Sequence, residues 1–321
     1  MPWGPSMGFA FQRFQPAQPF DGEQLREAVL ALARRFSIEI TPKQAAKVED
    51  FAALLPRATR VFVTFVPGET VDAVIATIHR LAAAGMRPVP HVAARNLRAR
   101  ATFEHLVRGS FAAGAREALV IAGGSAQPAG PFTSSMDLLQ TGLFETLGYE
   151  RLYVAGHPEG SPDIPPDELA RALACKNDWS KRTGIPLEIV TQFGFDAERI
   201  LAWERELKGI GVDLPVRVGV AGPASIASLL KYAKMCGVRA SLGFLQKHGG
   251  RMLQMLGHAT PDRLIVEIAA AVAQEEGRRI HALHYYPFGG FAVTAAWARA
   301  TAEGRFELAS DGSGFVVAEP H

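Results

Sequence analysis

The sequence is poor in cysteine. Its 321 residues include only Cys175 and Cys236, which lie far apart in segments with helical periodicity. A disulfide-stapled scaffold needs more cysteines than this, and a structural zinc site normally shows a CxxC or HExxH spacing, which the sequence lacks. The cysteine content therefore excludes a disulfide framework, argues against structural zinc and fits a reduced intracellular compartment.

Long apolar runs are also missing. No stretch approaches the roughly 20 apolar residues that a membrane-spanning helix needs. The first twenty residues contain prolines and an arginine but no continuous apolar core of the signal-peptide type. We therefore expect a soluble, cytoplasmic protein that does not bind membranes.

Neither sign of charge dominates, and the common nucleotide motifs are absent. The formal net charge is +2, with basic and acidic residues mixed along the chain. Arg95, Arg98 and Arg100 form only a weak basic cluster, typical of a solvated face or a local anion contact, so we expect no nucleic-acid partner. No GxGxxG follows a strand and no Walker A lysine motif occurs, so the sequence does not support a dinucleotide-binding domain or a P-loop.

The sequence does contain a regular alternation of short apolar runs and helical segments. Eight apolar runs are each followed by a helical segment, including one expected helix over 42–55 and one over 135–148. Strict alternation with eight units predicts a single (β/α)8 barrel of the α/β class. The eight expected strands are 36–41, 60–66, 87–94, 117–124, 151–156, 186–193, 214–222 and 279–288.

The barrel is expected to occupy most of the chain as one domain. We assign residues 1–22 to an aromatic-rich N-terminal arm that packs on the barrel or on another subunit. Residues 23–304 form the catalytic barrel, with extra helices at about 239–256 and 261–276 before the last strand. Residues 305–321 form a C-terminal hairpin or tail around the turn sequence SDGSG.

Glu39 is unusual because it is a carboxylate inside an apolar strand. A solvated position on a half-exposed strand is the simpler interpretation. In a barrel strand, however, the side chain points either into the barrel or at the helix layer, and both places are poorly hydrated. Burial raises the pKa of a carboxyl group and keeps it protonated, which suits a general acid.

Three histidines also fall in or at the ends of expected strands. His91 and His157 end the third and fifth strands, and His284 lies in the eighth. Together they predict a polar, ligand-binding mouth, although any one of them fits a buried histidine with satisfied hydrogen bonds. A three-histidine metal site is the competing interpretation, but no acidic partner is spaced to complete it, and we predict no metal.

Two further strand ends carry residues suited to a flat ligand. Gly123 and Gly124 end the fourth strand and would let a planar group or a phosphate approach the backbone, or simply form a tight turn. Gln192 offers a donor and an acceptor side by side for a heterocycle edge, and Phe193 can stack on a ring. The alternative interpretation of Gln192 and Phe193 is an ordinary strand end whose phenylalanines belong to the core.

The strand-end sequences resemble those of the methylenetetrahydrofolate reductase family. VAGHPEGSPD followed by VTQFGFD is similar to the family's fifth and sixth strand ends, where the resemblance is most specific. SIEITP, VFVTF, PHV, LVIAGGS and VRVGVAGPAS agree with other family segments in order and spacing, over about residues 36–300.

The resemblance implies a flavin-containing (β/α)8 oxidoreductase. Such an enzyme passes a hydride from NADH or NADPH to FAD and then to methylenetetrahydrofolate, in one-carbon metabolism and methionine biosynthesis. By motif position, Glu39 resembles the general acid, while Gln192, Phe193 and Tyr232 resemble substrate-binding residues. Positions resembling flavin contacts are Thr64, His91, Gly123, Gly124, Ser125, Ala155, His157 and Lys176. Family members assemble in more than one way, so a homo-oligomer is one expectation.

Several positions depart from the family pattern. Ser125 stands where the family has an aspartate, Gly123 where it has an arginine, and Ser161 where a histidine is expected. Removing a negative charge beside a flavin makes its ring easier to reduce and removes a stabiliser of a cationic folate intermediate. The departures leave two hypotheses: an atypical reductase working in either direction, or a folate-binding one-carbon transferase component or binding protein without flavin redox chemistry.

Overall fold

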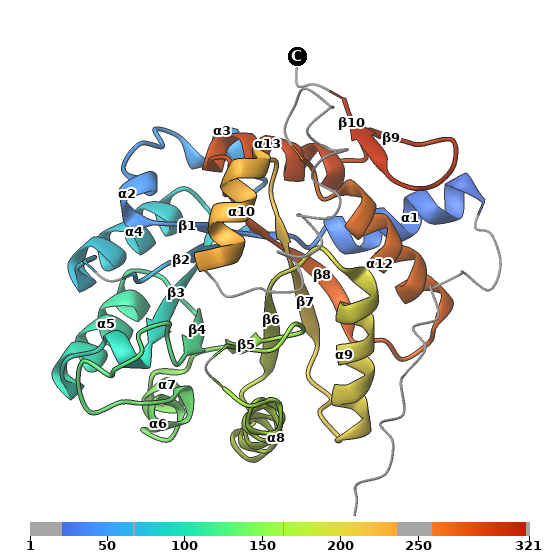
Figure 1. Cartoon of the computed structure of the whole chain (residues 1–321). Helices are drawn as coiled ribbons and strands as arrows, with labels where there is room; N and C mark the ends of the chain where they lie inside the picture. The colour runs from blue at the N-terminus through green and yellow to red at the C-terminus, as the bar shows by residue number, and fades with distance from the viewer. Residues whose placement is uncertain (1–20, 67, 163, 236–258, 319–321) are drawn as a thin grey trace, which may run out of the picture.

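Eight parallel strands close into a barrel in the order in which they occur in the chain (Figure 1). The structure, a computed structural model, describes residues 21–66, 68–162, 164–235 and 259–318. The predicted (β/α)8 fold is confirmed. The strands are β1 (Ser37–Ile40), β2 (Arg60–Val63), β3 (Arg87–Ala93), β4 (Glu117–Ile121), β5 (Arg151–Gly156), β6 (Leu187–Phe193), β7 (Val216–Ala221) and β8 (Ile280–Tyr286).

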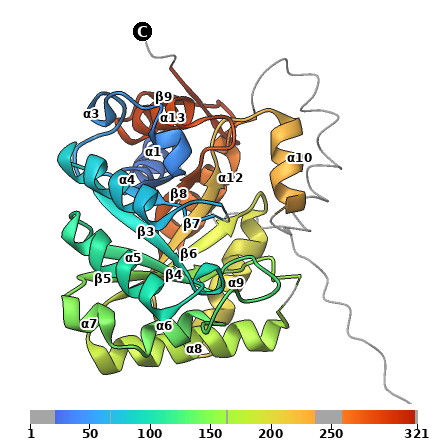
Figure 2. The same cartoon turned by 90° about the vertical axis from the view of Figure 1, so that its left-hand side faces the viewer.

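Helices surround the barrel, as Figures 1 and 2 show from two directions. They are α1 (Gly22–Ala33), α2 (Pro42–Ala45), α3 (Phe51–Leu54), α4 (Val71–Ala83), η1 (Ala94–Asn96), α5 (Arg100–Ala112), α6 (Ser135–Leu139), α7 (Leu143–Leu147), α8 (Pro166–Thr183), α9 (Ala197–Gly209), α10 (Ile226–Met235), α12 (Asp262–Gln274) and α13 (Phe291–Ala302). The expected N-terminal arm up to Phe20, Cys236 and the expected helix at 239–256 lie outside the described residues.

Two expected helices are each divided in two. Asp50 caps α3, because its carboxylate accepts from the amides of Ala52 and Ala53 and so begins a new helix inside the predicted 42–55 segment. Gly142 adopts a left-handed φ of 71° between α6 and α7, where a helix cannot continue. The periodicity of both segments is helical, but an N-cap begins a new helix in the first segment and a glycine interrupts the second.

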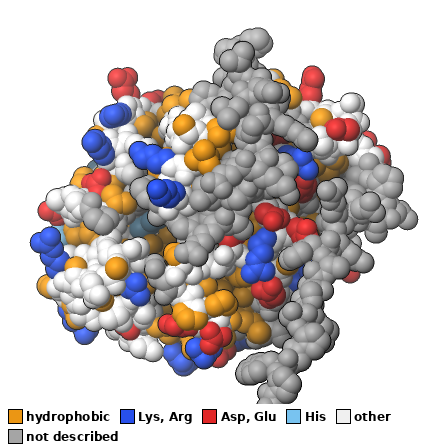
Figure 3. Space-filling view, in the orientation of Figure 1, with side chains coloured by type: hydrophobic (Ala, Val, Ile, Leu, Met, Phe, Trp, Pro, Cys, Tyr) orange, Lys and Arg blue, Asp and Glu red, His pale blue; other side chains and the backbone are white. Residues whose placement is uncertain are grey.

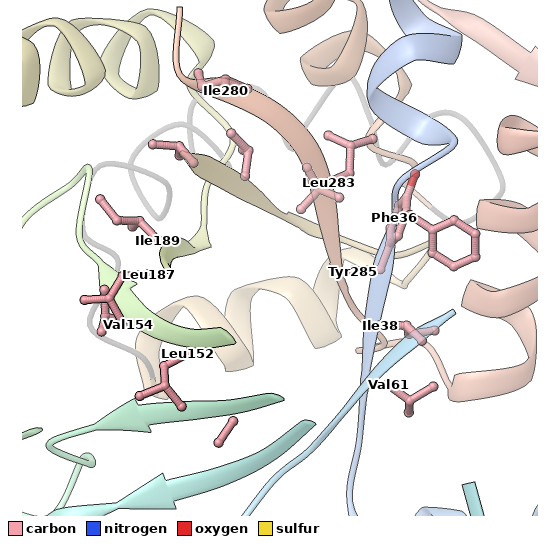
Figure 4. Close-up of a cluster of buried hydrophobic side chains, with 14 of the residues drawn as sticks. Phe36, Ile38, Val61, Leu152, Val154, Leu187, Ile189, Ile280, Leu283 and Tyr285 are labelled. Atoms are coloured by element: carbon pink, nitrogen blue, oxygen red, sulfur yellow. The ribbon is translucent and has the colours of Figure 1, made fainter. Parts of the chain in front are cut away.

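The main hydrophobic core lies between the outer face of the barrel and the helices. Side chains such as Ile38, Val61 and Leu152 point outward from their strands and are fully buried (Figure 4). Because side chains alternate along a strand, their neighbours point into the barrel. A second cluster therefore fills the interior with Phe62, Val89, Leu119, Tyr153 and Val190.

A layer of charged side chains closes the amino-terminal end of the barrel interior. Glu117 accepts from the guanidinium of Arg60 at 2.7 Å and from the hydroxyl of Tyr153 at 2.6 Å. Glu188 accepts from Arg217 Nε at 2.9 Å and from His281 Nε2 at 3.0 Å. We call these residues, with Arg87 and Arg151, the barrel floor; this end of the fold usually serves stability rather than chemistry.

The C-terminal segment forms the predicted hairpin. β9 (Phe306–Leu308) pairs antiparallel with β10 (Phe315–Val317) around the turn. Phe315 stacks on Trp297 of α13, with ring centroids 5.4 Å apart, and its amide donates to Asp262 of α12. The hairpin is therefore fixed to two of the helices that cover the barrel.

Candidate active site

The carboxyl ends of the strands bring together several of the predicted site residues. In barrels of this architecture the catalytic groups lie at this end, which we call the mouth. Glu39, His91 and His284 come from β1, β3 and β8, three separate strands of the closed barrel. Barrel closure places β8 beside β1, so residues from opposite ends of the sequence become neighbours.

Glu39 lies between two imidazoles. Its Oε1 atom is 3.4 Å from His91 Nε2 and 3.6 Å from His284 Nε2. The Glu39 side chain is 17% exposed, whereas those of His91 and His284 are 9% and 0% exposed. Neither Nε2 atom has a hydrogen-bond partner among the described residues. The carboxyl group is thus the most open of the three to a ligand at the mouth.

Burial sets the protonation states of this cluster. Loss of hydration raises the pKa of the Glu39 carboxyl group, and the opposing attraction of His91 is smaller. Burial lowers the pKa of His91 to about 4, against the pull of Glu39 and helped by His284. Burial and then the charge of Arg217 hold the pKa of His284 well below its usual range. At neutral pH the two imidazoles are uncharged, and the carboxyl group that they face keeps its proton to a higher pH than an ordinary glutamate does.

Ser37 fixes the orientation of His284. The serine hydroxyl lies 2.8 Å from His284 Nδ1 and also within 3.4 Å of the carbonyl of Leu283. When the hydroxyl donates to that carbonyl, Nδ1–H donates to the hydroxyl and Nε2 keeps its lone pair. This tautomer presents an acceptor to Glu39, which matches a protonated carboxyl group.

A small hollow lies at the carboxyl ends of β5 and β6. It is lined by Pro158, Glu159, Gln192, Phe193, Gly194 and Ile200. Gln192 and Phe193, two predicted substrate-binding residues, therefore border the same hollow, and the Pro-Glu loop after β5 forms its other wall. The amide of Gln192 can donate and accept to the edge of a ring placed there.

Aromatic rings extend from this hollow to α10. Phe193 packs edge-on against Phe288, with centroids 4.7 Å apart, and Phe288 stacks on Tyr232 at 4.1 Å. Tyr286 stacks on Phe288 and contacts the ring of His284 edge-on at 4.8 Å. Tyr232, the third predicted substrate-binding residue, thus belongs to one aromatic cluster with Phe193. Flat apolar surface of this kind suits a planar ligand.

Lys176 is a buried cation near the end of β5. It lies on α8 with 8% exposure, and the part of the chain that the structure describes offers it no ion pair with a carboxylate. Burial lowers the pKa of Lys176 to about 8. Burial, and then the charge of Lys176, lower the pKa of His157 to about 4. A buried cation beside a neutral imidazole is suited to an anionic group.

The β4 end is organised around Asn96 and Arg95. The hydroxyl of Ser125 donates to Asn96 Oδ1 at 3.1 Å, and the guanidinium of Arg95 donates to the carbonyls of Ser125 and Thr133. Gly123 has a φ of 91°, which favours glycine there, whereas an added Cβ on Gly124 would meet nothing within 4 Å. Only the first glycine is required by the turn.

The remaining predicted positions are also at the mouth. Thr64 follows β2 and is 9% exposed, and Ala155 pairs with Val190 in the β5–β6 register.

The three histidines do not converge: among the residues that the structure describes, no group of three or more histidine, cysteine or acidic side chains could hold a metal ion. Sequence analysis missed Ser37 and Tyr286, although their two-residue spacing from Glu39 and His284 places each pair on one strand face.

The surface charge and the helices give little further information about function. On the face drawn in Figure 3, basic and acidic side chains are interspersed. Within the described ranges, no helix has the length and apolar character needed to cross a membrane.

The fold and the mouth define the protein as a (β/α)8 barrel with a buried carboxyl–imidazole cluster. No model of a protein family matches the chain. A segment of 93 residues is 33% identical to methylenetetrahydrofolate reductase 1 of Schizosaccharomyces pombe, covering 29% of this chain and 15% of that protein. The match therefore spans well under two thirds of the relative's length.

Solved structures also align with the barrel. A putative phosphonomutase from Burkholderia cenocepacia gives a TM-score of 0.45 at 11% identity, with 83% of this chain and 92% of that chain covered. Dihydropteroate synthase from Thermus thermophilus gives 0.41 at 14% identity, with 81% and 89% covered. Scores this low say nothing about the activity of this chain.

Proposed function

We propose that this barrel is a folate enzyme that interconverts 5,10-methylenetetrahydrofolate and 5-methyltetrahydrofolate with NADH or NADPH. The observation that carries the proposal is Glu39: a carboxyl group with a raised pKa, held between two neutral imidazoles at the mouth of the barrel. The partial similarity to a methylenetetrahydrofolate reductase supports the same substrate.

The chain's own residues supply a proton and a binding surface. In the reducing direction a hydride adds to the methylene carbon, the bond from that carbon to N10 breaks, and N10 takes the proton of Glu39. The carboxylate that remains lies beside His91, whose Nε2 can carry an N–H toward it. Gln192 recognises the edge of the pterin ring, and the aromatic cluster of Phe193, Phe288 and Tyr232 packs on its apolar parts.

The residues at the β5 end fit the FAD that the resemblance implies. Lys176 is buried without a described carboxylate partner, so an anionic group such as a diphosphate would compensate its charge, and His157 lies beside it. The chemistry that FAD would supply there is the relay of a hydride between the nicotinamide and the folate. Lys176, His157 and the backbone of Gly123 are the residues that we expect to hold it.

One observation favours a second candidate, a folate-binding barrel without flavin redox chemistry. Ser125, in place of an acidic residue, donates a hydrogen bond to Asn96, and Gly123, in place of an arginine, has no side chain. Neither position presents the charge that the family pattern has there. This candidate predicts folate affinity without nicotinamide turnover.

The visible absorption spectrum distinguishes the two candidates. The purified protein is mixed with FAD, then with NADH in the absence of oxygen, and then with methylenetetrahydrofolate. We expect a flavin band that bleaches with NADH and returns with the folate. A protein that takes up no FAD but binds 5-methyltetrahydrofolate in calorimetry would support the second candidate, and one that binds no folate would contradict both.

A further inference from the structure

The strand that carries Gln192 is irregular at the mouth. The four residues of β6 from Val190 to Phe193 run beside only three of β7, from Arg217 to Gly219. One extra residue on one strand is a β-bulge, and it breaks the alternation of side chains. As a result two successive residues, Gln192 and Phe193, both reach the hollow at the mouth, where a regular strand would turn one of them away.

Three residues hold this bulge in place. The hydroxyl of Thr191 accepts from the amide of Gly219 and donates to the carbonyl of Gln192, both at 2.8 Å. The hydroxyl of Tyr286, on β8, reaches across the end of β7 and donates to the carbonyl of Thr191 at 2.8 Å. The bulge is therefore bonded to β7 through the hydroxyl of Thr191 and to β8 through the carbonyl of Thr191.

Gly219 makes room for the bulge. A Cβ atom at this position would lie 2.5 Å from the carbonyl oxygen of Thr191 and 2.7 Å from that of Gln192. Both contacts are with backbone, which cannot turn aside as a flexible side chain can. The backbone of the bulge therefore lies so close to residue 219 that only glycine fits there.

We propose that Tyr286, Thr191 and Gly219 are positioning residues that set the place of Gln192 and so the affinity for the folate ring. The inference rests on the proposed folate substrate. Tyr286 links the two halves of the mouth, because its ring contacts His284 beside Glu39 while its hydroxyl holds the bulge that carries Gln192. The hydroxyl alone serves the second role, so the two roles can be separated.

Tyr286→Phe tests the hydroxyl while keeping the ring. We expect the Kd for 5-methyltetrahydrofolate and the KM for methylenetetrahydrofolate to rise about three- to tenfold, the effect of one lost hydrogen bond, while kcat changes less than about twofold because Glu39 is untouched. Tyr149→Phe is the matched control: its buried hydroxyl donates to the carbonyl of Val107 at 2.9 Å, away from the mouth. It should lower the unfolding temperature similarly and leave Kd and KM unchanged.

A double-mutant cycle with Gln192→Ala shows whether Tyr286 acts through that amide. In the Gln192→Ala background, Tyr286→Phe should change the Kd by less than about twofold, because there is no amide left to position. A Tyr286→Phe protein with wild-type Kd would overturn the inference and leave the proposed function standing, as would an equal effect in both backgrounds. A wild-type protein with no affinity for 5-methyltetrahydrofolate would overturn both.

Discussion

Glu39 shows how a barrel interior raises the pKa of a carboxyl group. Two imidazoles lie within 3.6 Å of it, yet burial keeps both uncharged and so denies Glu39 a cationic partner. Had either histidine been protonated, its charge would lower the pKa of Glu39 and hold the group ionised. The raised pKa of Glu39 therefore depends first on its own burial and then on the burial that keeps its neighbours uncharged.

Replacing Glu39 with glutamine should remove the proton but keep the shape. We expect kcat for methylenetetrahydrofolate reduction to fall by about 10²–10⁴-fold, the usual contribution of a general acid, with little change in KM. Because the pKa of Glu39 is raised, the wild-type rate should decline as pH rises through that value, and the variant should lack this decline. Glu49→Gln, at an exposed position, is the control for steady-state kinetics; an unchanged kcat in Glu39→Gln would refute the assignment.

Lys176 offers a prediction about stability as well as binding. Its folded-state pKa of about 8 is below the ordinary 10.5, so the unfolded chain binds more protons between these values. The cost of burying the charge is fully present below pH 8, is of the order of 3 kcal/mol, and disappears as pH rises to 10.5. Lys176→Met should therefore stabilise the ligand-free protein at pH 7 in urea unfolding.

The same substitution should weaken FAD binding, because it removes the cation that we assign to the diphosphate. Fluorescence titration with FAD would measure the loss, which we expect to be about tenfold or more, as for one charge-assisted hydrogen bond. Lys181→Met, exposed on the same helix, is the matched control and should change neither property. A Lys176→Met protein that is less stable and binds FAD normally would show that Lys176 has a structural partner instead.

Among the elements, α4 and α5 meet at a close contact that can be tested by repacking. A Cβ on Gly109 of α5 would lie 2.4 Å from Cδ1 of Ile75 on α4. Gly109→Ala gains up to about 1 kcal/mol of helix propensity but costs about 1–3 kcal/mol through overpacking. We expect a net loss of stability in urea unfolding.

Ile75→Val removes Cδ1, the atom nearest to the added methyl group. The double variant Gly109→Ala with Ile75→Val should therefore be more stable than the sum of the two single changes predicts, by about 1 kcal/mol. Ile75→Val alone should cost about 0.5–1.5 kcal/mol. Strict additivity would mean that the helices move apart rather than clash.

The elements also show what sequence patterns can and cannot predict. Apolar runs located all eight strands, since a strand covered on both faces is apolar over most of its length. The division of the 42–55 and 135–148 segments depended on Asp50 and Gly142, single residues whose caps and dihedrals compete with helical periodicity. The bulge at Thr191 could not be predicted from the sequence of β6, because the residues that hold it, Gly219 and Tyr286, lie on β7 and β8.

At the scale of the whole molecule, barrel closure is what creates the site. Glu39, His91 and His284 were each predicted as mouth residues, but their convergence follows from the register of β1 with β8, which no local pattern contains. His157 was grouped with the other histidines and instead lies beside Lys176. Residue types at strand ends were predictable, whereas distances between strands were not.

The barrel floor tests whether the opposite end of the molecule is needed for stability. Burial opposes ionisation of Glu188, but the hydrogen bond from His281 and the charges of Arg217 and Arg151 outweigh it and lower its pKa to about 2. Its contribution to the free energy of unfolding is therefore present above pH 4.5 and lost as pH falls toward 2. Acid unfolding of the wild-type protein should begin within this window.

Glu188→Gln should leave the guanidinium of Arg217, only 1% exposed, without its carboxylate. We expect the free energy of unfolding at pH 7 to fall by about 3–5 kcal/mol, the cost of breaking a buried ion pair from one side. When the pH is lowered from 7 to 3, the variant should lose less of this free energy than the wild type does. Glu206→Gln is the control, since its ion pair with Arg199 is largely exposed and should contribute less than about 1 kcal/mol. Equal losses in the two variants would mean that water enters the barrel floor and screens its charges.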